Sequence, residues 1–387
     1  MKKLILAILV LTLLVSGCTP ADKKEDLPMP TEVDPQPEST APESTEPTGD
    51  SVIIQQDMTA VSLPVVKETL TDKDGTVLFT YQGQSMNLVV ADPGVADKIL
   101  IDFFTQQDTF RAASEDIKSS AKDNTSGTPM FYDALFAPAR IDMNVLSLQG
   151  AVVFWSGGSR PSYSAITANY SMVNGDKLTL GGILTHENQA DALCKLLIDS
   201  ITKVKSDYAI WDDFESEVKN RFSGNISEDE LWFFDETGIN FCFHPGTIAS
   251  ALSGIITVNV PYSDLVGIIE GDYFPVEQAA ATGKLNIKPL GDGDTQQFSQ
   301  IAEIVTEENS DMVLLYTDEA ITDVTIQLDH THTVFATAAL TPGDAIMLEA
   351  DLTGHIVVVN YTSAGQSHSR YIKWDNGTAT LLEDIPE

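Results

Sequence analysis

The sequence predicts a mixed α+β domain, in which helices pack on an antiparallel sheet, followed by a small all-β domain. Apolar residues recur first at strand and helix spacings and later only in short strands between regular turns. Hydrophobic residues make up 43% of the 387 positions, which is enough to bury a sizeable core. Length and pattern together predict more than one domain.

The first residues predict a lipoprotein signal peptide over residues 1–17. Lys2 and Lys3 precede an apolar run from Leu4 to Val15, which is too short to span a bilayer. The run ends in Val-Ser-Gly-Cys, which resembles the lipobox of bacterial lipoproteins. The resemblance implies that Cys18 is lipidated (diacylglycerol and palmitate) and that the protein is extracytoplasmic, anchored to the bacterial cell membrane by lipid alone.

Residues 18–51 predict a disordered tether. This stretch alternates Pro with Glu, Asp, Ser and Thr, and almost none of it can be buried. The tether therefore separates the anchor from the folded part.

Residues 52–275 predict the α+β domain. Strand patterns flank a hairpin signal at Asp72–Gly75, and Asp92-Pro93 predicts an N-cap and first turn of a helix that ends near Ser120. Strand patterns return between 130 and 180, and two more helices are expected at about 186–206 and 211–222. The remaining strands are expected at 231–234, 239–243 and 254–260, before a last short helix that opens at Pro261.

The rest of the chain predicts a linker over residues 276–296 and a small all-β domain over residues 297–387. The linker is rich in Gly, Ala and Asp, and the β domain has four turn signals between its short strands. These signals lie at 317–318, 342–344, 353–354 and 376–377.

Charge excludes some classes of partner. The chain carries 57 acidic and 22 basic side chains and a net charge of −35. Nucleic acid is therefore excluded, because phosphate binding needs clustered Lys and Arg. No later apolar stretch is long enough for a polytopic membrane protein.

Two stretches resemble a pair of extracellular families. Residues 142–183 contain GGSRP and NGDKLTLGGIL, and residues 231–265 contain LWFFDETGINFCFHPGT and ITVNVPYSDL. Together they resemble the unknown-function families DUF4163 and DUF3298. This pairing occurs in the lysozyme-sensing anti-sigma factor of Gram-positive bacteria and beside a peptidoglycan deacetylase domain. The resemblance implies an envelope ligand such as lysozyme or a muramyl glycan.

The sequence departs from the family pattern at three places. Ser159-Arg160 follows Gly157-Gly158 where the family usually has Gly-Gly-x-His, and Gly246-Thr247 replaces part of a Pro-Tyr-Glu-Ile-Ala-Pro motif. Only three residues precede the signal core, which predicts no cytoplasmic sigma-binding segment. The protein is therefore not expected to be an anti-sigma factor.

No catalytic motif stands out, and the sequence predicts a non-enzymatic protein without a cofactor. The Gly-x-Ser-x-Gly, Walker and dinucleotide patterns do not occur. His330 and His332 share a strand face, but no third metal ligand is evident. Cys194 and Cys242 are expected to be buried thiols, with a disulfide as the alternative.

Two loops are candidate ligand-binding sites. In each, the same residues more often have a purely structural role, as a turn or as a buried aromatic side chain. The first joins an aromatic, a cation and glycines in Trp155, Gly157, Gly158, Ser159 and Arg160. The second contains His244, Gly246 and Thr247.

These features favour a surface lipoprotein that binds lysozyme, another cationic protein or peptidoglycan. The negative charge steers cations in general, so it indicates the class of partner. A cell-wall hydrolase and a structural docking module of an envelope complex remain as alternatives.

Overall fold

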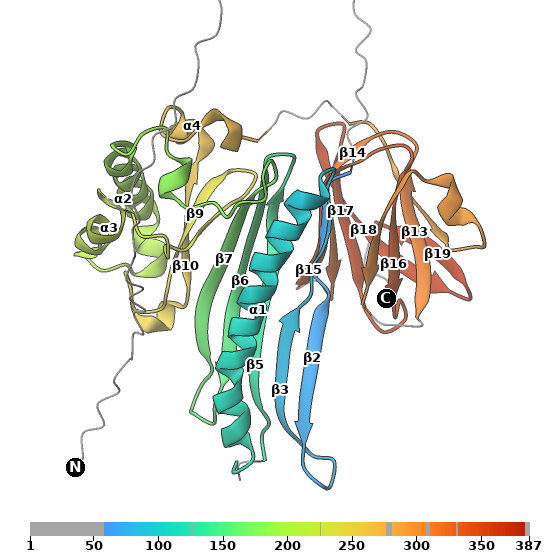
Figure 1. Ribbon diagram of the computed structural model, residues 1–387, viewed down its shortest axis with the longest axis horizontal. Coiled ribbons are helices and arrows are strands. Elements are labelled where there is room, and N and C mark those ends of the chain that lie inside the picture. Colours follow the sequence, from blue (N-terminus) through green and yellow to red (C-terminus); the bar gives the residue numbers. More distant parts are fainter. Residues whose placement is uncertain are drawn as a thin grey trace, which may run out of the picture. The chain divides into compact units, whose positions relative to one another are not determined.

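The computed structural model describes residues 58–124, 127–224, 226–275, 281–306, 310–329 and 332–383 (Figure 1). All of them belong to one compact unit, Ile54–Glu387. The predicted signal peptide, the lipidation residue Cys18 and the tether 18–51 lie outside the described residues. No described helix is both long and apolar enough to cross a membrane.

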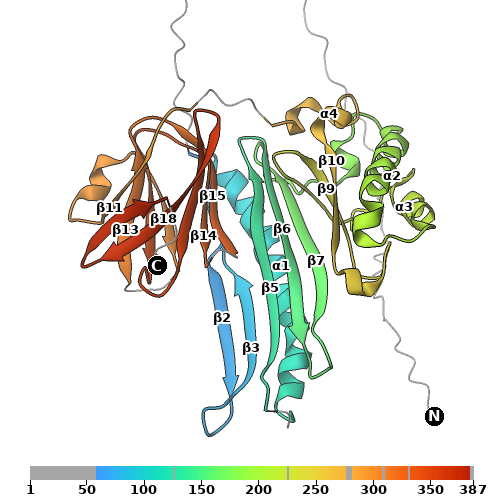
Figure 2. The ribbon, with the colours of Figure 1, turned by 180° about the vertical axis from the view of Figure 1, so that it is seen from behind.

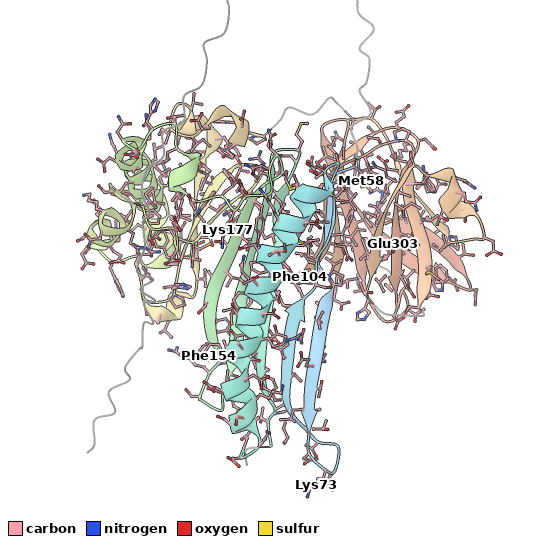
Figure 3. The ribbon with its side chains drawn as sticks, viewed as in Figure 1. Met58, Lys73, Phe104, Phe154, Lys177 and Glu303 are labelled. Atoms are coloured by element: carbon pink, nitrogen blue, oxygen red, sulfur yellow. The ribbon has the colours of Figure 1, made fainter. Side chains whose placement is uncertain are left out.

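A five-stranded sheet lies at the centre of the α+β part. Its strand order is β2-β3-β5-β6-β7, and only the β3–β5 pair is parallel. The predicted hairpin turn at Asp72–Gly75 joins the first two strands, and Lys73 lies at its tip (Figure 3). The strands are β2 (Val65–Thr71), β3 (Val77–Gln84), β5 (Met130–Ile141), β6 (Val145–Trp155) and β7 (Ser162–Ser171).

One long helix, α1 (Pro93–Ala121), covers one face of this sheet. Asp92 caps it as predicted, because its Oδ1 accepts a 2.8 Å hydrogen bond from the backbone N–H of Gly94 and Pro occupies the first helical position. Val95, Ile99 and Phe103 face the sheet and are buried. Seen from the other side, the strands lie in front of α1, and no helix of the described residues covers them (Figure 2).

The segment between β7 and residue 275 forms a second layer of helices and strands. Its sheet has the order β10-β9-β8, and the predicted helices occur within a few residues of their expected bounds. The 3₁₀ turns 181–183, 251–253 and 271–273 connect the longer elements. These elements are α2 (Gln189–Tyr208), α3 (Phe214–Phe222), β8 (Trp232–Phe234), β9 (Gly238–Phe243), β10 (Ile256–Pro261) and α4 (Tyr262–Leu265).

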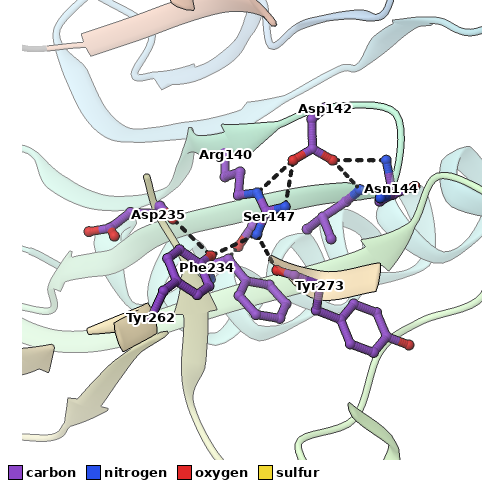
Figure 4. A network of polar contacts seen from close by, with 9 residues as sticks. Arg140, Asp142, Asn144, Ser147, Phe234, Asp235, Tyr262 and Tyr273 are labelled. Carbon is purple, nitrogen blue, oxygen red and sulfur yellow. Dashed lines mark hydrogen bonds and ion pairs between the residues drawn. The ribbon is translucent and has the colours of Figure 1, made fainter. Parts of the chain in front are cut away.

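A buried arginine joins this layer to the central sheet (Figure 4). Arg140 on β5 donates from Nε to Asp142 Oδ2 at 2.7 Å, and from Nη1 to the Tyr262 hydroxyl and the Tyr273 carbonyl, each at 2.6 Å. Tyr262 in turn donates to the Asp235 carbonyl at 3.0 Å. The network fixes α4 and the β8–β9 turn against the end of β5.

The C-terminal part consists of two sheets that share one apolar core. Their orders are β19-β18-β17-β14-β15-β1-β4 and β11-β13-β16-β12. The predicted turns separate these strands. The strands are β1 (Ala60–Ser62), β4 (Asn87–Val89), β11 (Leu285–Pro289), β12 (Gln300–Val305), β13 (Asp311–Thr317), β14 (Ile321–Leu328), β15 (His332–Leu340), β16 (Asp344–Ala350), β17 (Val357–Ser363), β18 (Gln366–Asp375) and β19 (Thr378–Leu382).

The β part takes strands from both ends of the chain. β1 pairs with β15, and Met58 (labelled in Figure 3) and Ala60 lie in the C-terminal core. Val61 and Leu63 pack beneath α1. Residues 285–289 form β11, so the linker interpretation of 276–296 is wrong for these residues, whose ladder with β13 overrides their weak local signal. The predicted fold class, α+β with a β-rich C-terminal part, is confirmed.

Candidate functional site

The first predicted loop is a tight connection between β6 and β7. Trp155 closes β6, and its indole Nε1 donates a 2.7 Å hydrogen bond to the Gly158 carbonyl. Gly157 has a φ of 91°, which a residue with a side chain rarely adopts, and 157–160 are exposed. The indole N–H is therefore used to hold the turn, while Ser159 and Arg160 face solvent.

The second predicted loop follows β9. Nδ1 of His244 accepts a 3.4 Å hydrogen bond from the backbone N–H of Ala165 on β7. Partial burial and the positive charge of Arg221 lower the pKa of His244. Gly246 has a φ of 83°, and the backbone N–H of Thr247 donates to the His244 carbonyl at 3.1 Å, which closes the turn.

The structure does not join the two loops into one site. No hydrogen bond or ion pair among the described residues connects 155–160 with 244–247. Each loop therefore has to be judged with its own neighbours.

The second loop lies beside three exposed apolar side chains that the sequence analysis missed. Trp211 donates from its backbone N–H to the Ile248 carbonyl at 3.0 Å, and the Ser253 hydroxyl donates to the Tyr208 carbonyl at 3.1 Å. Tyr208, Trp211 and Leu252 are 38%, 44% and 83% exposed. We call these three residues the Trp211 surface.

The turn between α2 and α3 positions this surface. Ala209 ends α2 in the left-handed conformation, with a φ of 50°, and its N–H caps the helix on the Lys205 carbonyl. Ile210 and Phe214 then point into the core. The side chains of Tyr208 and Trp211 are left outside, because Ile210 between them takes the buried position.

Carboxylates are frequent in the chain segment that carries Tyr208 and Trp211. Residues 205–217 contain five acidic side chains and a single lysine. Lys205 pairs with Asp212 at 2.6 Å, and this hydrogen bond holds the pKa of Asp212 below its usual range. Asp207 and Asp213 are exposed and form no ion pair with any described residue. The rim is therefore anionic.

The potential metal ligands and the two thiols do not form a common site among the described residues. The described residues contain no group of three or more His, Cys, Asp or Glu side chains able to hold a metal, and His330 lies outside them. Cys194 and Cys242 are buried free thiols, as the sequence predicts, and they do not form the disulfide that was the alternative. Burial raises the pKa of Cys242 to about 11, so this thiol is not an activated nucleophile.

The Trp211 surface lies inside a segment that matches a known family model. Residues 183–263 match the family described as "Protein of unknown function (DUF3298)". This segment includes α2, α3 and the 244–247 loop but excludes Trp155 and 157–160. The predicted DUF3298 resemblance is thus confirmed for these residues, whereas the DUF4163 and anti-sigma resemblances stay predictions.

Two solved structures of this family are similar to the chain. A DUF3298 family protein from Pseudomonas aeruginosa PAO1 has a TM-score of 0.39 and 12% identity, and covers 56% of this chain and 97% of its own. A member from Bacteroides fragilis has a TM-score of 0.39 and 15% identity, with coverages of 56% and 96%. No curated protein matches the chain.

Proposed function

We propose that the protein is a non-enzymatic, extracytoplasmic lipoprotein whose DUF3298 segment binds a cationic protein of the lysozyme class. The Trp211 surface with its anionic rim carries this proposal. Exposed Trp and Tyr supply rigid apolar area, and the surrounding carboxylates match a positively charged partner.

Three features of the sequence support a membrane-anchored protein outside the cytoplasm that attracts cationic partners. The lipobox-like residues before Cys18 support anchoring to the membrane, and the Pro-rich stretch 18–51 supports a tether. The net charge of −35 supports steering of cations toward the protein at low salt. Steering alone is unspecific, so specificity has to come from the apolar contact.

Cell-wall glycan is the second candidate ligand. Trp and Tyr side chains combine an apolar ring with a polar group, a combination that also suits sugar faces. A neutral glycan would gain nothing from Asp207 and Asp213 beside the rings. The cationic protein therefore remains the first candidate.

The test is calorimetric titration of the full mature chain with a c-type lysozyme. Trp211→Ala and Leu252→Ala are each expected to weaken binding at least tenfold at about 0.5 M salt, where the Debye length is only a few Å. Phe104→Ala is the matched control, because Phe104 is 41% exposed but lies on α1, outside the matched segment (Figure 3). Equal losses in all three variants, or binding that the Trp211 and Leu252 variants retain, would contradict the proposal.

A further inference from the structure

The central sheet has one face that α1 does not cover. Side chains directly opposite each other in a ladder lie on the same face. Tyr132 opposes Phe154 and packs beneath α1 with Tyr81. The alternate residues therefore point to the other face, over which the described part of the chain places no helix (Figure 2).

The ladder registers show which residues share this uncovered face. Phe131 opposes Trp155, Asp133 opposes Val153, and Val153 opposes Tyr163. Near β8 and β9 the face is buried, because Ala165 packs there against Phe233 and Cys242. Toward the β6–β7 turn it is more open, and Tyr163 is 51% exposed. We call Phe131, Asp133, Val153, Trp155 and Tyr163 the Asp133 face.

Asp133 has an unusual environment in the middle of this face. Its Oδ1 is buried and has no hydrogen-bond partner, and no ion pair or hydrogen bond reaches its side chain from any described residue. Burial raises the pKa of Asp133 to about 6, and the charge of Lys67 opposes this shift. The residue as a whole is half-buried, so the buried Oδ1 is one shielded oxygen of a partly accessible carboxylate. A shielded polar atom that serves only the fold normally has a partner, so this oxygen requires an explanation.

Lys67 does not supply the missing partner. It lies on the same face but two strands away, because Lys67 opposes Gln82 and Gln82 opposes Asp133. At about 4.8 Å between strands, this places the two backbones roughly 10 Å apart. Lys67 is the one basic residue among the positions that these ladders place across from Asp133.

We infer that the Asp133 face receives an arginine side chain of the cationic protein partner. The guanidinium would pair with the Asp133 carboxylate while the flanking rings of Phe131 and Trp155 contact its flat faces. A carboxylate that is partly shielded from water, as Asp133 is, gains more from such a partner than one that is fully hydrated. This inference rests on the proposed function and adds a second contact outside residues 183–263.

The test uses hexa-arginine as the probe and the full mature chain. Asp133→Asn is expected to weaken hexa-arginine binding at least fivefold at pH 7 and physiological salt. Asp108→Asn is the matched control: it removes the same charge from an exposed residue of α1, on the opposite side of the sheet, and is expected to change binding less than twofold. Equal effects of the two substitutions would overturn the inference, since only net charge would then matter.

A second readout locates the contact. In an NMR spectrum of protein labelled at the aspartate carboxyl carbons, the signal that is absent from the Asp133→Asn variant belongs to Asp133. In the unsubstituted protein this signal should shift when hexa-arginine is added, and the apparent pKa of Asp133 should fall toward its usual range. An unmoved signal would overturn the inference. If Asp133→Asn does not fold, Tyr163→Ala takes its place, and undiminished binding of hexa-arginine by that variant would count against the inference.

The two proposals can fail separately. If hexa-arginine binds at Asp133 but lysozyme does not bind, the proposed function fails and the arginine site stands. If lysozyme binding depends on Trp211 but neither ligand depends on Asp133, the function stands and this inference fails.

Discussion

The hydroxyl of Thr337 donates a 2.6 Å hydrogen bond to the backbone carbonyl of Thr59, 278 positions earlier in the chain. This hydrogen bond lies at one end of the β1–β15 ladder, in which Ala60 opposes Thr337. Residues 60–62 thus complete the C-terminal sheet and, through Val61, also the core beneath α1. The two parts of the molecule share a strand.

This shared strand predicts that the two parts do not separate cleanly by truncation. A chain that ends at residue 290 leaves β1 without β15 and exposes Val61 and Leu63. We expect it to aggregate or to lose its cooperative thermal transition. A chain that begins at residue 58 is the control and should keep the transition of the full protein. Normal cooperative unfolding of the chain ending at 290 would refute the coupling.

The buried hydrogen bonds of Gln84 predict that its substitution lowers stability strongly. Its Nε2 donates to the Leu63 and Phe136 carbonyls at 3.3 and 3.0 Å, and its Oε1 accepts from the Phe136 N–H at 2.6 Å. Gln84→Leu leaves these backbone groups buried without partners and should lower the free energy of unfolding by about 3 kcal/mol. Urea denaturation measures the change.

Gln82→Ala is the control for that substitution, because Gln82 lies on the same strand but is only partly buried. It should cost less than about 1 kcal/mol. Equal losses at the two positions would show that the Gln84 hydrogen bonds contribute little.

The burial of Arg140 predicts that its substitution also lowers stability strongly. Arg140 is 2% exposed, and Asp142 depends on it for charge compensation. Arg140→Met should lower the free energy of unfolding by about 3–5 kcal/mol, because Asp142 becomes a buried, unpaired charge. Tyr262→Phe removes one neutral partner of the guanidinium and should cost about 1 kcal/mol. A smaller loss for Arg140→Met than for Tyr262→Phe would contradict the role of the charge.

Asp133 predicts a pH dependence of stability. Burial raises its pKa from 3.8 to about 6, so the folded state holds this proton more tightly than the unfolded state. The stabilisation by the bound proton is complete below about pH 4 and is lost as the pH rises through about 6. Asp133→Asn should therefore raise the Tm relative to the wild type more at pH 7 than at pH 4. Thermal scans at both pH values test this, and equal differences would contradict the raised pKa.

Local sequence signals predict much of the α+β part. The Asp92-Pro93 pair marks the start of α1, and apolar residues at helical spacing then place Val95, Ile99 and Phe103 against the sheet. The hairpin at Asp72–Gly75 and the turns of the β part are likewise encoded by a few adjacent residues. These elements could be predicted because their determinants are close together in the sequence.

Contacts between distant residues could not be predicted in this way. The pairing of β1 with β15 has no local signal, and β11 is specified mainly by its ladder with β13. The 246–247 loop was predicted, but the hydrogen bonds of Trp211 to Ile248 and of Ser253 to Tyr208, which place these rings next to it, join residues far apart in the sequence. A tryptophan among acidic residues between two predicted helices was the signal that could have pointed to this surface.

The salt dependence of lysozyme binding to the full chain tests most directly whether the DUF3298 segment recognises a cationic protein. Binding should weaken as salt is raised but persist at about 0.5 M, because the apolar contact of Trp211 is not screened. Trp211→Ala should remove this salt-resistant binding. Binding that vanishes at 0.5 M salt, or that is unchanged by Trp211→Ala, would contradict the claim that the DUF3298 segment recognises a cationic protein.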